Sequence, residues 1–175
     1  VTSTPTLKYF PVKMVISTTN SSSNRRIGDK ILIKGLYIKG SFEANATPTE
    51  PQIIRLIIEC LKQPHNANPL LTEILTNTGT GTLIHSFYNR QKIHNYKILY
   101  DRVHDVEKQQ TGAVLKHEKH FKIYIPLNIE SVWSATEPTD LTTCQKNGLF
   151  AIFAGDESSN GPGCTFQWRV VFTDT

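Results

Sequence analysis

Apolar and polar residues alternate with a period of two along much of this chain, and this pattern limits the possible folds more than any other feature. In the clearest run, residues 120–129, every second residue from Phe121 to Ile129 carries a large apolar side chain. Successive side chains of a β-strand point to opposite faces, so the run predicts a strand with one buried face. The same alternation predicts strands over residues 9–17, 54–60 and 165–173.

Four less regular segments bring the expected number of strands to eight: residues 30–42, 82–87, 96–106 and 148–155. The last of them is apolar on both faces, which predicts a central strand of a sheet. Helical periodicity is nearly absent, apart from one or two turns expected over residues 68–75, with Pro69 in the first helical position. Eight strands with little helix predict a sandwich or a barrel. The periodicity leaves an immunoglobulin-like sandwich and a jelly roll as alternatives.

Length, hydropathy and cysteine content narrow the class of protein. The chain of 175 residues fits one domain, 1–175. Its apolar runs are far shorter than the roughly 20 residues that a membrane helix needs, so we expect no membrane insertion. Three cysteines without a zinc-type spacing favour reduced thiols over a disulfide scaffold. The chain starts at Val1 with no initiator Met, from which we expect a processed or trimmed N-terminus.

Positive charge is concentrated in the first quarter of the chain. Residues 1–42 carry seven Lys or Arg against one acid, whereas residues 43–175 carry 12 basic and 14 acidic residues. The net charge of +4 therefore combines a basic N-terminal part with a nearly neutral body. This asymmetry predicts an end that binds polyanions. For Lys34 and Lys39 the alternative is that they are strand-edge lysines that keep the protein soluble.

Sequence motifs for catalysis are missing. The chain contains no GxSxG, HExxH, GxxxxGK[ST] or GxGxxG segment. His117 and His120 are three residues apart, which on a strand points their imidazoles to opposite faces. Asp101, Asp105 and Glu107 can share one strand face, but the Lys and Arg residues beside them favour a solvated, salt-bridged surface. We therefore expect no enzyme, no metal site and no cofactor.

One segment carries a resemblance to a known family. Residues 26–40 (Arg-Ile-Gly-Asp-Lys-Ile-Leu-Ile-Lys-Gly-Leu-Tyr-Ile-Lys-Gly) resemble the second strand of capsid proteins of small circular single-stranded DNA viruses, the circovirus- and geminivirus-like group. Further segments are similar to later strands of these capsid proteins in the same order: residues 96–102 (Tyr-Lys-Ile-Leu-Tyr-Asp-Arg), residues 119–128 with their Lys-x-Phe start, residues 147–153 and residues 169–174.

The resemblance implies an all-β protein, a single eight-stranded jelly-roll sandwich of two four-stranded antiparallel sheets. It also implies that sixty copies form an icosahedral T=1 shell, a virion assembled in the host nucleus, around a circular single-stranded DNA. The family carries an Arg/Lys-rich arm ahead of the jelly roll. This chain shows none, so either the arm was removed or the basic strand face takes its role. Small RNA viruses of plants share this jelly roll, so an RNA virus coat protein is an alternative, and the host receptor is not identified.

Five basic residues of the N-terminal part are the predicted nucleic-acid contacts: Lys8, Lys13, Arg25, Arg26 and Lys30. Such contacts would be electrostatic and independent of sequence, with Tyr9 and Phe10 as candidates for stacking on bases. The alternation of Phe10 with later apolar residues favours a core position instead. Trp133 is a candidate anchor of a subunit interface, or else an aromatic residue that caps the core. With Asp140 it gives slight support to a third alternative, a carbohydrate-binding module.

Overall fold

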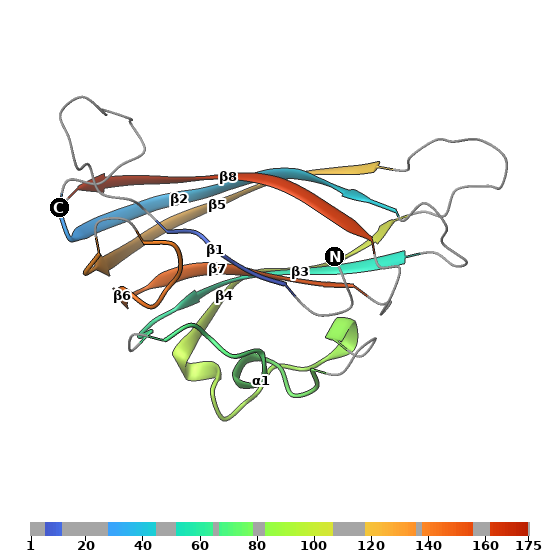
Figure 1. Ribbon diagram of the computed structural model, residues 1–175, viewed down its shortest axis with the longest axis horizontal. Helices are drawn as coiled ribbons and strands as arrows, with labels where there is room; N and C mark the ends of the chain where they lie inside the picture. Colours follow the sequence, from blue (N-terminus) through green and yellow to red (C-terminus); the bar gives the residue numbers. More distant parts are fainter. Residues whose placement is uncertain are drawn as a thin grey trace, which may run out of the picture.

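The computed structural model describes residues 6–11, 28–44, 52–64, 67–78, 83–106, 118–135, 138–155 and 162–174. Within these residues the strands are β1 (Thr6–Tyr9), β2 (Lys30–Glu43), β3 (Gln52–Leu61), β4 (Tyr96–Val106), β5 (Glu118–Trp133), β6 (Cys144–Lys146), β7 (Gly148–Gly155) and β8 (Gly163–Asp174). They form two four-stranded antiparallel sheets, one in the order β1-β7-β3-β4 and one in the order β6-β5-β2-β8. The protein is an all-β jelly-roll sandwich, as predicted (Figure 1).

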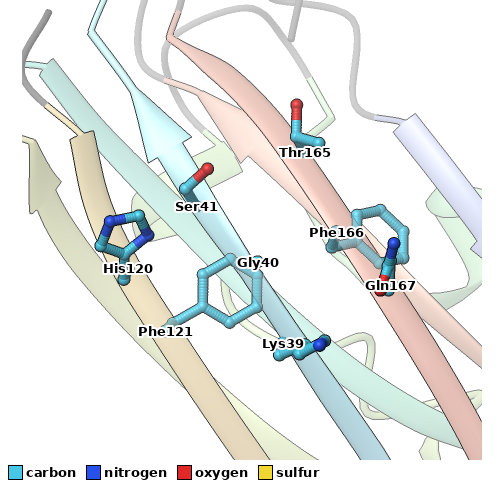
Figure 2. Close-up of a pocket in the computed structure, with 8 residues that line it drawn as sticks. All are labelled: Lys39, Gly40, Ser41, His120, Phe121, Thr165, Phe166 and Gln167. Atoms are coloured by element: carbon cyan, nitrogen blue, oxygen red, sulfur yellow. The ribbon is translucent and has the colours of Figure 1, made fainter.

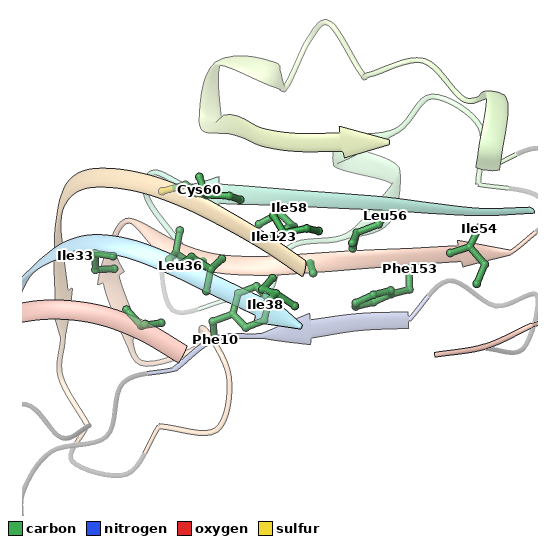
Figure 3. Packing of buried hydrophobic residues seen from close by; sticks show 14 of the residues in the cluster. Phe10, Ile33, Leu36, Ile38, Ile54, Leu56, Ile58, Cys60, Ile123 and Phe153 are labelled. Atoms are coloured by element: carbon green, nitrogen blue, oxygen red, sulfur yellow. The ribbon is translucent and has the colours of Figure 1, made fainter. Parts of the chain in front are cut away.

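The main hydrophobic core lies between the two sheets (Figure 3). Every second residue of β3, such as Ile54 and Leu56, meets apolar residues of β2 such as Leu36 and Ile38, and all four are fully buried. The inward residues of β5, Ile123 among them, complete this layer. The period-two pattern therefore produces the sandwich directly, because each sheet places one apolar face against the other.

A second apolar layer covers the other face of the β1-β7-β3-β4 sheet. It is provided by a cover segment, residues 67–78 and 83–95, which contains α1 (Leu71–Ile74) and the 3₁₀ turns η1 (Leu83–His85) and η2 (Ile93–Asn95) and lies across that sheet in Figure 1. Strand β7 is buried on both sides, with Ala151 in the main core and Ile152 under the cover segment. The prediction of a central strand over residues 148–155 is confirmed.

Three local predictions were wrong. Residues 83–85, expected within a strand, form the η1 turn, in which Leu83 and Ile84 are both buried and the backbone oxygen of Leu83 accepts a hydrogen bond from Arg55 of β3. The eighth strand is instead β6, in a segment where no strand was expected. Helix α1 is a single turn whose N-cap is Leu70, so Pro69 lies ahead of the helix rather than in its first position. Of the strand predicted over residues 9–17, residues 12–17 lie outside the described residues.

Candidate nucleic-acid interface

The predicted basic contacts are only partly described by the structure. Lys8 is exposed on β1, opposite Ala151, and Lys30 is exposed at the start of β2, opposite Val132. Because β1 and β2 belong to different sheets, the structure does not join these two lysines into one strand face. Lys13, Arg25 and Arg26 lie outside the described residues.

The two aromatic residues proposed for stacking on bases are not exposed platforms. Phe10 is 1% exposed, and its ring packs edge-on against Trp168 with 5.4 Å between the ring centroids. The core position favoured by its alternation is therefore the observed one. Tyr9 is half-buried, and burial, together with the negative charge of Asp140, raises its pKa.

Trp133 does not provide an exposed interface anchor. It is 1% exposed at the end of β5 and belongs to the apolar layer that also contains Leu141, Cys144 and Phe150. The alternative, an aromatic residue that caps the core, is what the structure shows. Burial of large apolar side chains contributes roughly 25 cal/mol for each Å² removed from water, which explains why the tryptophan at the end of this strand points inward.

The outer face of the β5-β2-β8 sheet gathers basic and aromatic side chains from three strands. Strand register places Lys39 of β2 opposite Lys122 of β5, and Tyr37 opposite both Tyr124 of β5 and Arg169 of β8. Alternate residues of the same strands are buried in the main core, so these side chains point away from it; the buried neighbours are Leu36, Ile38, Ile123, Ile125 and Val170. We refer to Tyr37, Lys39, Lys122, Tyr124 and Arg169 as the tyrosine–lysine face.

The charge of this face is uncompensated by acidic residues of the same strand segments. Residues 34–41, 120–128 and 165–172 contain four Lys or Arg and neither Asp nor Glu. Acidic side chains stand at the ends of the strands: Glu43 is paired in register with Glu118 at one end, and Glu130 binds Lys146 at 2.9 Å near the other. The middle of the sheet is therefore positive.

Packing on this face holds the tyrosines in place. A Cβ added at Gly35 would come 2.8 Å from Cε2 of Tyr124, so the missing side chain is what lets the Tyr124 ring lie across β2. Nζ of Lys122 lies 5.6 Å from the ring centroid of Tyr37, within the range of a cation–π contact. Tyr124 is nevertheless 59% exposed.

Two open pockets adjoin on the same sheet. One, of about 510 Å³, is lined by Tyr37, Lys39, Tyr124, Gln167, Trp168, Arg169 and Val171. The other, of about 360 Å³ and shown in Figure 2, is lined by Lys39, Gly40, Ser41, His120, Phe121, Thr165, Phe166 and Gln167. Because both share Lys39 and Gln167, they form one depression across β5, β2 and β8.

We did not predict the tyrosine–lysine face from the sequence, because its residues are scattered along the chain. Lys34 and Lys39 were visible as basic residues of one strand, but Lys122, Tyr124 and Arg169 are far away along the chain. Only strand pairing brings them together. The available hint was the alternation itself, since Lys122 and Tyr124 occupy the polar positions of the clearest predicted strand.

A second polar group, under the cover segment, is an ion pair between Arg55 and Asp101. The guanidinium of Arg55 donates to Oδ1 of Asp101 at 2.9 Å and to Oδ2 at 2.7 Å, and Tyr88 donates to Oδ2 at 2.7 Å. Burial would raise the pKa of Asp101, but these hydrogen bonds hold it below its ordinary value. Asp101 thus differs from the solvated, salt-bridged carboxylate that we expected beside Lys97 and Arg102.

The remaining candidate groups show no metal arrangement. His120 is exposed, with Nδ1 3.7 Å from Oε1 of Glu118, while His117 and Glu107 lie outside the described residues. In the described part of the chain, no three His, Cys, Asp or Glu residues are placed to hold a metal ion. No helix found there is long and apolar enough to cross a membrane.

Neither the protein-family models nor the curated proteins that we searched contain a match to this chain.

Proposed function

We propose that this protein is the capsid protein of a small circular single-stranded DNA virus. Its copies would assemble into an icosahedral shell, with sixty subunits as the expected number, and package the genome through contacts that do not depend on base sequence. In this proposal the protein is a component of the virion and is not an enzyme.

The observation that carries the proposal is where the family-like segments fall in the fold. The described part of residues 26–40 lies at and within β2, residues 96–102 begin β4, and residues 119–128 lie in β5. Residues 147–153 lead into β7, and residues 169–174 end β8. Segments that resemble the family in sequence thus provide five strands of the kind of sandwich that the family uses, in the same order.

The charge of the chain agrees with a packaging role. The protein carries a net charge of +4, and Lys8 and Lys30 are exposed. Phosphate neutralisation by lysine and arginine gives binding that is independent of sequence and weakens with salt.

The carbohydrate-binding alternative loses the two residues on which it depended. Trp133 is buried and provides no platform for a sugar ring. Asp140 accepts hydrogen bonds from the backbone N–H and the hydroxyl of Thr142 and from the side-chain amide of Asn68. The carboxylate oxygens of Asp140 are therefore engaged in hydrogen bonds that stabilise its own loop.

Sedimentation velocity of the purified protein, followed at 260 and 280 nm, tests the proposal. Sixty copies of the 19.7 kDa chain give a particle of about 1.2 MDa. We expect this particle, with excess absorbance at 260 nm that remains after external nuclease treatment. Extracted nucleic acid that DNase digests and RNase does not would support a DNA genome, and the reverse would favour the RNA virus alternative. A stable monomer or trimer at all salt and protein concentrations would contradict the capsid proposal.

A further inference from the structure

We propose that the tyrosine–lysine face binds single-stranded nucleic acid, with bases stacked on Tyr124 and Tyr37 and phosphates held by Lys39, Lys122 and Arg169. This inference deepens the packaging part of the proposed function by naming a surface and a binding mode. It rests on that function for the identity of the polyanion, but it does not require the shell.

Positive charge is dense on the tyrosine–lysine face. The three cations of the face occupy two adjacent rows across the sheet: Lys39 faces Lys122 in one row, and Arg169 follows in the next. Neighbouring strands lie about 4.8 Å apart, and alternate residues of one strand lie roughly 7 Å apart. All three are exposed, so a single short stretch of polyanion backbone can contact them together. The nearest acidic residues along these strands lie beyond the two rows, which leaves the cations available to phosphate.

Two tyrosine rings lie among the cations of this face. Tyr124 is 59% exposed although it lies on β5, an inner strand of its sheet. Gly35 makes room for its ring on β2. Tyr37 lies beside it in register and is backed by the ammonium group of Lys122. Exposed aromatic rings on a sheet, interleaved with basic residues, are the arrangement on which unpaired bases stack.

The shape of the face also suits a single strand. The depression across β5, β2 and β8 is open and its two parts adjoin at Lys39 and Gln167, so it can follow a flexible strand across the sheet. A sheet face such as this one cannot enter the groove of a duplex, whereas the unpaired bases of a single strand can reach its tyrosine rings. A sulfated polysaccharide would use the same cations but would gain nothing from base stacking on the tyrosines. The rings therefore favour single-stranded nucleic acid.

The test is a fluorescence anisotropy titration of the full chain with a labelled oligothymidylate of about ten nucleotides, a length within the usual range for such sites. We expect Tyr124→Leu to weaken binding about tenfold and Tyr124→Phe, which keeps the ring, to restore most of the affinity. Lys39→Gln should weaken binding and lower the slope of log affinity against log salt by about 0.7, the value for one lost phosphate contact on a single strand.

Matched controls come from the cover segment. Phe87 is 81% exposed and Lys92 is exposed, and both lie on the opposite side of the sandwich, so Phe87→Leu and Lys92→Gln should bind the oligonucleotide like the unchanged protein. Denaturant unfolding of each variant establishes that the sheet is intact. A variant that fails to fold is replaced by Lys122→Gln, which changes an exposed side chain on the neighbouring strand.

The possible outcomes distinguish failure of the binding face from failure of the capsid proposal. If Tyr124→Leu and Lys39→Gln bind like the controls, the inference is overturned, and a 1.2 MDa particle in the sedimentation experiment would leave the proposed function standing. If heparin binds as tightly as the oligonucleotide and Tyr124→Leu changes neither affinity, the face is a site for polyanions in general and the stacking mode is wrong. If the face binds the oligonucleotide as expected but no large particle forms at any concentration, the binding site stands and the capsid proposal fails.

Discussion

Arg55 and Asp101 form a two-point ion pair that joins β3 to β4 beneath the cover segment, with N–O distances of 2.9 and 2.7 Å. Arg55 also donates to the backbone oxygens of Leu83 at 3.1 Å and Ser86 at 2.7 Å. A single buried side chain thus joins two strands to the η1 turn, which explains why this turn lies against the sheet.

Replacing Asp101 should destabilise the fold. Asp101→Asn removes the carboxylate that accepts two hydrogen bonds from the guanidinium of Arg55, a residue that is only 7% exposed. Removing one partner of a buried pair typically costs 3–5 kcal/mol, so we expect a loss of about 3 kcal/mol in the free energy of unfolding, measured by chemical denaturation. Asp105→Asn, at an exposed position of the same strand, is the control and should change stability by less than about 0.5 kcal/mol. Equal effects of the two substitutions would show that the pair is not structural.

Glu59 should make stability depend on pH in the neutral range. It is fully buried, neither of its oxygens has a hydrogen-bond partner among the described residues, and burial, with the nearby charge of Asp101, raises its pKa from 4.5 to about 7 despite the opposing effect of Arg55. The folded state therefore binds this proton more tightly than the unfolded state. Its contribution is complete below about pH 4.5 and is lost as the pH rises through about 7, a difference of roughly 3 kcal/mol.

Glu59→Gln should remove this dependence. Unfolding free energies of the variant and the unchanged protein, measured from about pH 3 to 8, should diverge in favour of the variant as the pH rises above about 4.5. Glu130→Gln is the comparison of opposite sign, because the hydrogen bond from Lys146 lowers the pKa of the exposed Glu130 carboxyl, so its contribution is lost as the pH falls. A flat pH profile for the unchanged protein would contradict the burial argument for Glu59.

The two glycines of β2 should respond differently to a methyl group. A Cβ at Gly35 would meet the movable end of the Tyr124 side chain, whereas a Cβ at Gly40 would lie 2.8 Å from the Cα of Phe166, in the backbone of β8. Overpacking against backbone typically costs 1–3 kcal/mol. We therefore expect Gly40→Ala to lower the unfolding free energy by about 2 kcal/mol and Gly35→Ala by less than about 1 kcal/mol. Denaturant midpoints compare them, and equal losses would show that Tyr124 cannot move aside.

Trp133 should matter for folding of the single chain. Trp133→Ala empties a buried site and should cost about 3–5 kcal/mol. Trp133→Phe keeps most of the apolar volume and removes an indole N–H that has no hydrogen-bond partner in the described part of the chain, so it should cost much less. Unfolding is measured at a protein concentration at which the chain sediments as a monomer. An alanine variant with unchanged monomer stability but impaired assembly would instead support the interface role that the structure does not favour.

Much of the fold was predictable because it depends on local patterns. The alternation over residues 120–129 and 165–173 identified β5 and β8, and the doubly apolar run over residues 148–155 identified the central strand β7. The turn over residues 83–85 was mispredicted because adjacent buried side chains in the cover segment have no periodic signature. The polar positions of β3 were read as solvent-facing, yet Arg55 and Glu59 are buried, since the cover segment returns over that face.

Most strands, and an apolar face of each, could be located from the spacing of residues alone, because the pleat of a strand converts spacing along the chain directly into sidedness. The η1 turn and β6 were the exceptions. Which strands become neighbours was settled by the packing of the folded sandwich. That choice placed Arg169 and Tyr124 on either side of Tyr37, and Asp101 within reach of Arg55. Each of these contacts joins residues more than forty positions apart, and the pairing of strands depends on the packing of the whole core. The candidate binding face is for this reason a property of the folded sheet rather than of any single motif.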